Sequence, residues 1–222
     1  MQTLARSSGV SLSVFIGDHA QGALELRCFT PTSEKGESDS GALAALHHLG
    51  AGGALGNAVS VKMPKDTLEA RFLEGMRWLE QGSLSVDLQS PHTLPESLYT
   101  GLGLAGSLQY VVNTRVPFGL VRAKRPKLVV PLSRLRSLED LEPDYAALGQ
   151  LAKPYGAAGV VALALERSRL ALRHFMVGEM REDSAGANTA ACAAAYLTAY
   201  DGSRKLHPLI QRRTRYEVEQ GM

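Results

Sequence analysis

The chain has few cysteines, few aromatic residues and no long hydrophobic run. Its 222 residues include two cysteines, Cys28 and Cys192, and 6% aromatic residues. Both cysteines stand in apolar or alanine-rich segments, so we expect buried, reduced thiols and no disulfide. No uninterrupted apolar run approaches the roughly 18 residues of a membrane helix. The N-terminus lacks the basic region and long apolar core of a secretory signal, so we predict a cytoplasmic protein without a membrane partner.

The chain also has little net charge. Its 24 lysines and arginines against 22 acidic residues give a formal net charge of +2, which by itself indicates no nucleic-acid partner. Basic residues gather between 115 and 136, but aromatic residues are not interleaved with them, so we interpret this segment as a solvated surface. The set is Arg115, Arg122, Lys124, Arg125, Lys127, Arg134 and Arg136. The six histidines have no metal-ligand spacing, so we predict no metal site.

What the chain contains is ordinary for a folded protein, with 45% hydrophobic and 21% charged residues. Its length suits one large domain or two small ones. Within it, "ALELRCF" (23–29) resembles "LALRHF" (170–175), with matching Leu, Leu, Arg and Phe at one constant shift. The alternation predicts strands with one buried face. An apolar run precedes each segment, at 11–16 and 159–165, and an acidic loop and an alanine-rich run follow each. Each half therefore predicts strand, turn, strand, loop and helix, as in a tandem duplication into two lobes.

The alanine-rich runs predict two central helices, at "SGALAALHHLG" (40–50) and "ANTAACAAAYLTAY" (187–200). Each is apolar and small nearly all round, which is typical of a buried helix. We expect at least one of His47 and His48 to face the interior of its lobe.

The starts of these helices carry small and acidic residues. Asp39 or Ser40, and Asp183 or Ser184, stand where an N-cap belongs. Because helix N-termini expose unpaired N–H groups, two of them meeting across the lobe boundary would hold a small carboxylate. The predicted ligand-binding residues are Ser40, Gly41, Gly186, Ala187 and Asn188. The alternative, in which these residues only cap two helices, remains open.

The middle of the chain predicts further strands and two more helices. The connector "QSPHTLPE" contains two prolines and separates an N-terminal lobe (1–94) from a C-terminal lobe (95–222). A short helix is predicted at "LPESLYTGLGL" and one longer helix at "SLEDLEPDYAALGQLAK" (137–153). Strands are predicted at "LEARFL", "SLSVDL", "SLQYVVNT", "FGLVRA" and "KLVVPL".

In their order, these motifs resemble the PhzF-like isomerases of phenazine biosynthesis, which have the diaminopimelate epimerase fold. "LRCFTPTSE" is similar to their R-x-F-T-P-x-x-E, and "EDSAGANTAACAAAYL" to their E-D-x-A-T-G-S-A-x-x-x-L-A-x-Y-L. Further segments follow in consistent order, at "LARSSGVSLSVFI", "SVDLQSP", "VNTRVPFGLV" and "YEVEQG". The resemblance implies an α+β fold of two pseudo-symmetric lobes, each with a curved, mostly antiparallel sheet around a central helix.

The resemblance also implies a biosynthetic activity: a cofactor-free isomerase or epimerase that shifts a proton on a small carboxylated metabolite. From the family's catalytic group the chain retains Asp183. Asp39 stands in a related place before the first central helix. We therefore predict Asp183 and Asp39 as a two-base pair across a cleft, with one carboxyl protonated and the other ionised.

Three positions depart from the family's pattern. Leu12 replaces the Glu that serves as general acid and base, Ser40 replaces a His, and Asn188 replaces a Ser. Because leucine cannot carry a proton, these changes favour the alternative of an inactive relative that binds a small anion or acts as an assembly partner. The family's first and last strands are also missing, which would leave sheet edges unpaired, so we expect a homodimer.

Overall fold

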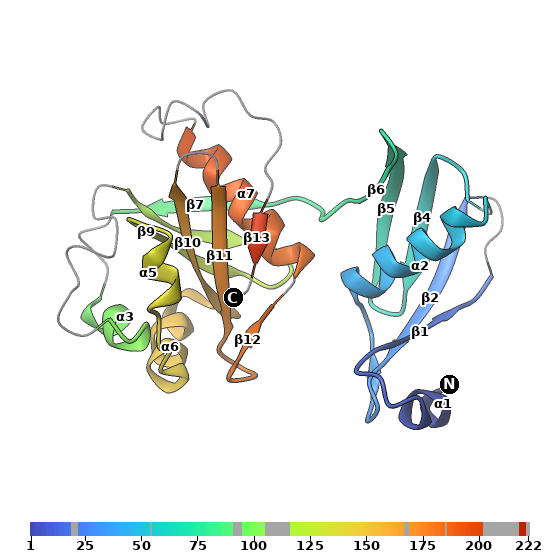
Figure 1. The fold of residues 1–222 in the computed structure, drawn as a ribbon, viewed down its shortest axis with the longest axis horizontal. Coiled ribbons are helices and arrows are strands. Elements are labelled where there is room, and N and C mark those ends of the chain that lie inside the picture. Colours follow the sequence, from blue (N-terminus) through green and yellow to red (C-terminus); the bar gives the residue numbers. More distant parts are fainter. Residues whose placement is uncertain are drawn as a thin grey trace. The chain divides into compact units, whose positions relative to one another are not determined.

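The computed structural model describes residues 1–18, 22–53, 55–90, 95–104, 116–166, 169–184, 186–201 and 218–220. The chain divides into two compact units, Met1–Gly82 and Ser83–Met222, each with its own sheet (Figure 1). The sequence places the boundary after residue 94. The contacts place it earlier, because β7 (Ser85–Gln89) pairs with β8 (Phe118–Arg122) in the second sheet. Among the described residues, no helix is long and apolar enough to span a membrane.

The first unit is a small sheet with one long helix. Its elements are α1 (Gln2–Ser7), β1 (Ser13–Ile16), β2 (Ala23–Phe29), β3 (Glu34–Lys35), α2 (Asp39–Ala51), β4 (Ala58–Met63), β5 (Asp66–Leu73) and β6 (Met76–Leu79). The strand order is β1-β2-β4-β5-β6, with β3 added to β2. The β2–β4 pair is parallel and the other pairs are antiparallel.

The core of this unit lies between the sheet and one face of α2. Leu24 and Leu26 of β2 are buried against Ala42, Ala45 and Leu46 of α2, as their spacing in a strand and a helix predicts. The other face of α2 is open to solvent, so the prediction that the helix is buried all round is wrong for this unit. The prediction that a histidine of this helix faces the interior is also wrong, since both are exposed.

The second unit has a larger sheet. It comprises α3 (Glu96–Gly101), β7, β8, β9 (Lys127–Leu132), α5 (Arg136–Glu139), α6 (Tyr145–Ala152), a 3-10 turn (Lys153–Tyr155), β10 (Gly159–Glu166), β11 (Arg169–Met176), β12 (Arg181–Asp183), α7 (Ala187–Asp201) and β13 (Val218–Gln220). The strand order is β12-β11-β10-β9-β8-β7, with β13 paired to β11. The β9–β10 and β11–β13 pairs are parallel.

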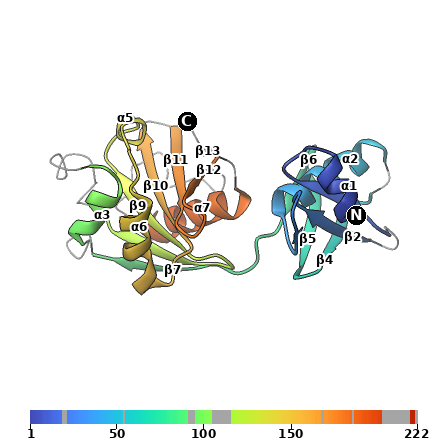
Figure 2. The ribbon, with the colours of Figure 1, turned by 90° about the horizontal axis from the view of Figure 1, so that it is seen from below.

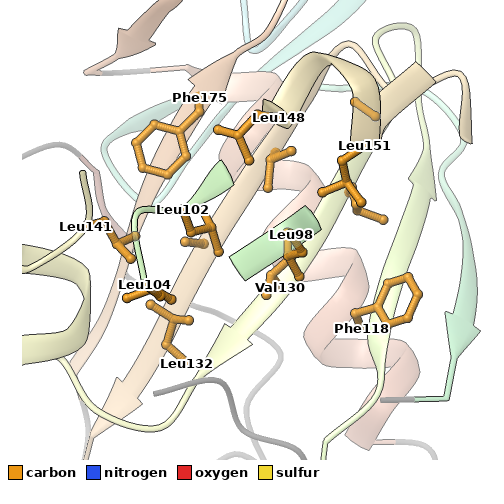
Figure 3. Close-up of a cluster of buried hydrophobic side chains, with 14 of the residues drawn as sticks. Leu98, Leu102, Leu104, Phe118, Val130, Leu132, Leu141, Leu148, Leu151 and Phe175 are labelled. Atoms are coloured by element: carbon orange, nitrogen blue, oxygen red, sulfur yellow. The ribbon is translucent and has the colours of Figure 1, made fainter. Parts of the chain in front are cut away.

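This sheet is covered on both faces. On one face, Leu98 and Leu102 of α3 and Leu148 of α6 pack with Val130 and Phe175 (Figure 3). On the other face, α7 packs through Cys192, Ala193, Tyr196, Leu197 and Tyr200. Figure 2 shows α7 on the side of the strands opposite to α3 and α6.

Most predicted elements of this unit are confirmed, with one correction. The segment predicted as a single helix over 137–153 forms two, α5 and α6. Pro143 disfavours a helical conformation in the residue before it. Asp144 then caps α6, with its Oδ1 accepting from the N–H groups of Ala146 (2.9 Å) and Ala147 (3.1 Å). The predicted strand "SLQYVVNT" lies outside the described residues.

The two units repeat one pattern, which confirms the predicted duplication. The order β10, β11, β12, α7 repeats β1, β2, β3, α2, and β13 runs parallel to β11 as β4 runs parallel to β2. A bidentate ion pair is repeated as well. Arg27 bonds Glu34 (2.8 and 2.7 Å), and Arg173 bonds Glu182 (3.0 and 2.8 Å). Each guanidinium also lies over a phenylalanine ring two residues further along its strand.

Candidate active site

Three polar side chains meet at the start of α7. Asp183 is the last residue of β12, and its ladder partner on β11 is His174. Nδ1 of His174 lies 3.3 Å from Oδ2 of Asp183 and 3.0 Å from Oγ1 of Thr189, in the first turn of α7. His174 is 2% exposed, whereas about a quarter of the Asp183 side chain (26%) is exposed. The carboxylate therefore connects a buried imidazole with the solvent.

Strand alternation places the imidazole on the α7 face of the sheet. Leu170 and Leu172 belong to the core under α7, and His174 is the next residue of the same face. Gly159 of β10 makes room for the ring, because a Cβ there would lie 2.5 Å from Nε2 of His174. Gly186 makes room for the carboxylate of Asp183, because a Cβ at position 186 would lie 2.7 Å from Oδ2 of Asp183.

Lys127 lies on the same face. It begins β9, pairs with Gly159 in register, and is 3% exposed. Burial lowers its pKa to about 8 and the positive charge of Arg125 adds to this shift, while the carboxylates of Asp183 and Glu179 partly oppose it. The prediction of a solvated basic segment is therefore wrong for Lys127, because β9 turns this side chain under α7.

His174 is neutral at neutral pH. Burial lowers its pKa to about 4, and the positive charge of Lys127 adds to the effect, while Asp183 opposes it. Cys192, one turn into α7, is equally buried, and burial raises the pKa of its thiol to about 11. Both cysteines are buried and free, as predicted. In the part of the chain that the structure describes, no three His, Cys, Asp or Glu side chains gather closely enough to hold a metal ion.

The helix starts differ from the prediction. Ser38, and neither Asp39 nor Ser40, caps α2, since its Oγ accepts from the N–H of Gly41 (3.2 Å). That N–H is thus already bonded, Gly41 is buried, and Ser40 is exposed. In the second unit the helix begins at Ala187, so neither Asp183 nor Ser184 is the cap.

Around the start of α7, three of the predicted ligand-binding residues do come together. Ala190 donates its N–H to the carbonyl of Gly186 (3.0 Å), which makes Gly186 the residue before the helix. Ala187 and Asn188 form the first turn, and both are partly exposed. Oδ1 of Asn188 is buried and has no hydrogen-bond partner among the described residues.

The ladders also change the equivalence between the repeats. Cys28 pairs with Lys35 in the first unit, as His174 pairs with Asp183 in the second. Lys35, and not Asp39, therefore occupies the place of Asp183. Asp39 is instead the first residue of α2, so the related places that the sequence assigned to Asp39 and Asp183 are wrong.

The two β-β-β-α units define the class of this protein: an α+β fold of the two-lobe epimerase type. A family model of phenazine biosynthesis-like proteins (PhzC-PhzF) matches residues 1–221. The chain therefore belongs to this family, as the sequence motifs predict.

Solved structures of the family have the same fold. The PhzF-family protein of Bacillus anthracis is 18% identical, with a TM-score of 0.74 over 93% of this chain and 72% of the other. The family protein of Enterococcus faecalis is 18% identical, with a TM-score of 0.63 over 88% and 68%. A "Predicted Epimerase" of Pseudomonas aeruginosa is 21% identical, with a TM-score of 0.58 over 90% and 70%. No curated protein matches the chain.

Proposed function

We propose that this protein is a cofactor-free isomerase or epimerase that moves a proton on a small carboxylated metabolite, with Asp183 as proton carrier. Membership of the PhzF-like family supports the reaction class. The observation that carries the assignment is the position of Asp183. One of its oxygens lies beside the buried imidazole of His174, and its side chain remains partly exposed at the start of α7.

The arrangement suits proton transfer beside a carboxylate. The ionised Asp183 would remove a proton from the carbon next to the substrate carboxylate. Negative charge then develops on the substrate, where the amino end of the 15-residue helix α7 stabilises it. In this proposal the backbone near Gly186, Ala187 and Asn188 binds the substrate carboxylate. Asp39, Ser40 and Gly41 of the first unit stay predictions from the sequence.

A second candidate function is binding without turnover. It is favoured by Leu12, which stands just before β1 and cannot transfer a proton. The sequence resemblance assigns this position to the family's acid and base Glu. Such a protein would bind a small anion at α7, or act as an assembly partner, and leave the ligand unchanged.

A thermal-melting screen against small hydroxy- and amino-carboxylic acids tests for binding. An acid present at 100 times its Kd stabilises the folded protein by about 2.7 kcal/mol, which shifts the melting temperature visibly. Each stabilising acid is then incubated with the protein in deuterated water, and deuterium at the carbon beside the carboxylate is followed by NMR.

The Asp183→Asn variant is compared with Asp87→Asn, which changes an exposed carboxylate of β7. We expect the first to abolish exchange and the second to leave it unchanged. Binding without exchange in the wild-type protein would favour the inactive relative. Exchange that survives in Asp183→Asn would reject Asp183 as the proton carrier.

A further inference from the structure

We propose that His174 is the positioning residue of Asp183: a neutral imidazole that carries its proton on Nδ1 and donates it to Oδ2 of the carboxylate. The inference rests on the proposed role of Asp183. It adds a residue outside the predicted site residues and assigns it a tautomer.

The ring is fixed from several sides. His174 and Asp183 are ladder partners, so their backbones hold the two side chains on the same face of neighbouring strands. Thr189 contacts Nδ1 from α7, and Gly159 leaves just enough room at Nε2. With 2% exposure, the imidazole has little freedom to turn away.

Hydrogen bonding selects the tautomer. Nε2 of His174 is buried and has no hydrogen-bond partner among the described residues. A proton on Nε2 would therefore be a buried donor without an acceptor, which costs more than a buried lone pair. A proton on Nδ1 faces two acceptors instead, the carboxylate of Asp183 and the hydroxyl of Thr189. The carboxylate is the stronger acceptor of the two.

Burial is the main reason that the ring is neutral, and the charged groups around it add to this effect or oppose it. Lys127 of β9 and Arg125 just before β9 repel a second proton, and Asp183 of β12 attracts one. From α7 the ring meets the neutral Thr189, and Cys192, further along the helix, has a protonated thiol. Because the ring is buried and its Nε2 is closed off from solvent, its role is to orient the partly exposed carboxylate and not to carry the proton itself.

The first unit provides an internal comparison. Its Arg27–Glu34 pair matches the Arg173–Glu182 pair, so both repeats keep the element that ties the third strand to the second. At the next ladder position the first unit has Cys28 and an exposed Lys35, which form no equivalent hydrogen bond. The fold therefore forms without an imidazole–carboxylate pair, and we infer that the pair in the second unit serves the site.

Two variants separate orientation from packing. In His174→Asn the side-chain amide nitrogen can take the place of Nδ1 and donate to Asp183. In His174→Leu the side chain fills the space without a donor. We expect His174→Leu to lower kcat for deuterium exchange by about 100-fold with little change in KM, since a misplaced catalytic group costs rates of that order. We expect kcat of His174→Asn to be at least tenfold higher than kcat of His174→Leu. Equal kcat values for two folded variants would overturn the inference.

NMR of the ring nitrogens in the wild-type protein tests the tautomer without any substrate. We expect a neutral ring at pH 7 with its proton on Nδ1. A proton on Nε2, or a charged ring, would overturn the inference even if no acid in the panel exchanges. If no acid exchanges while the Nδ1 proton is present, the proposed function fails and the positioning of Asp183 stands.

Discussion

At the residue scale, the least expected feature is the buried Lys127. Its pKa is lowered to about 8 from 10.5, mainly by burial, so the folded protein binds this proton less tightly than the unfolded chain. The stability that the neutral amine provides is present above pH 10.5 and is lost as the pH falls to about 8. At neutral pH the fold therefore carries the cost of a buried ammonium group.

The first prediction follows from this cost. Lys127→Met keeps the length of the side chain and removes the charge, so we expect the free energy of unfolding at pH 7 to rise by about 1–3 kcal/mol. Urea unfolding measures the change, with the exposed Lys153→Met as the matched control, which should have little effect. A lower stability of Lys127→Met would show that the ammonium group has a compensating partner.

The second prediction concerns His174 and acid. Its pKa is about 4 in the folded protein against 6.5 in the unfolded chain, so the unfolded chain binds the proton first. The stability that the neutral ring provides is present above pH 6.5 and is lost between pH 6.5 and 4, by an amount on the order of 3 kcal/mol. Unfolding free energies of the wild-type protein and His174→Asn should converge across this window. Parallel pH profiles would contradict the shift.

How much of the site could be predicted depends on the residue. Asp183 and Asn188 lie in a contiguous motif, and the sequence alone pointed to them. The burial of His174 could also be predicted, because it follows Leu170 and Leu172 on the buried face of an alternating strand. Nothing in the sequence indicates that Lys127 is buried, because a lysine beside other basic residues is typical of an exposed segment. Its burial follows only from the pairing of β9 with the neighbouring strands.

At the element scale, the repeated Arg–Glu pair has two different environments. Arg27 is half exposed (50%), whereas Arg173 is mostly buried (13%). Arg173 also donates to the carbonyls of Leu138 (2.8 Å) and Leu141 (3.0 Å), which ties α5 and the following turn to β11. Lysine cannot reproduce this planar fork of donors.

The third prediction compares the same substitution in both units. We expect Arg173→Lys to reduce the free energy of unfolding by about 2–4 kcal/mol, because carbonyl and carboxylate partners lose their donors away from water. Arg27→Lys should cost much less, since an exposed pair is screened by solvent. Urea unfolding of both variants measures the difference. Similar losses for the two would mean that burial does not separate the pairs.

The helices and strands that could be predicted from the sequence are those whose apolar residues follow a regular local spacing. The alternating strands, the short helix α3 and the helices α2 and α7 follow from periodicity. The helix predicted over 137–153 was too long because its apolar spacing continues through Pro143, and the proline ends that continuity. The equivalence of Asp39 and Asp183 failed for another reason. The two loops have the same length, but the second hairpin has one more ladder pair, Met176 with Arg181. Each of its strands is therefore one residue longer, and a contiguous match loses the register.

At the scale of the whole molecule, one architecture is present twice while the chemistry differs. The first repeat has a thiol and an exposed lysine at the ladder position where the second has an imidazole and a carboxylate. In the proposed function, the proton carrier is therefore the carboxylate of the second unit. The location of the protein in the cytoplasm stays a prediction.

The fourth prediction is the homodimer. Among the described strands, β1 pairs with β2 alone, so one of its edges has no strand partner there. Such an edge favours pairing with a second chain. We expect sedimentation to give twice the chain mass of 23.8 kDa at micromolar concentration. A single species at the mass of one chain would contradict the prediction.

The most direct test of the account is deuterium uptake, from deuterated water, into an acid that stabilises the wild-type protein. The account predicts uptake at the carbon beside the carboxylate with the wild-type protein and with Asp87→Asn, and none above background with a folded Asp183→Asn. Equal uptake with Asp183→Asn and the wild-type protein would contradict it.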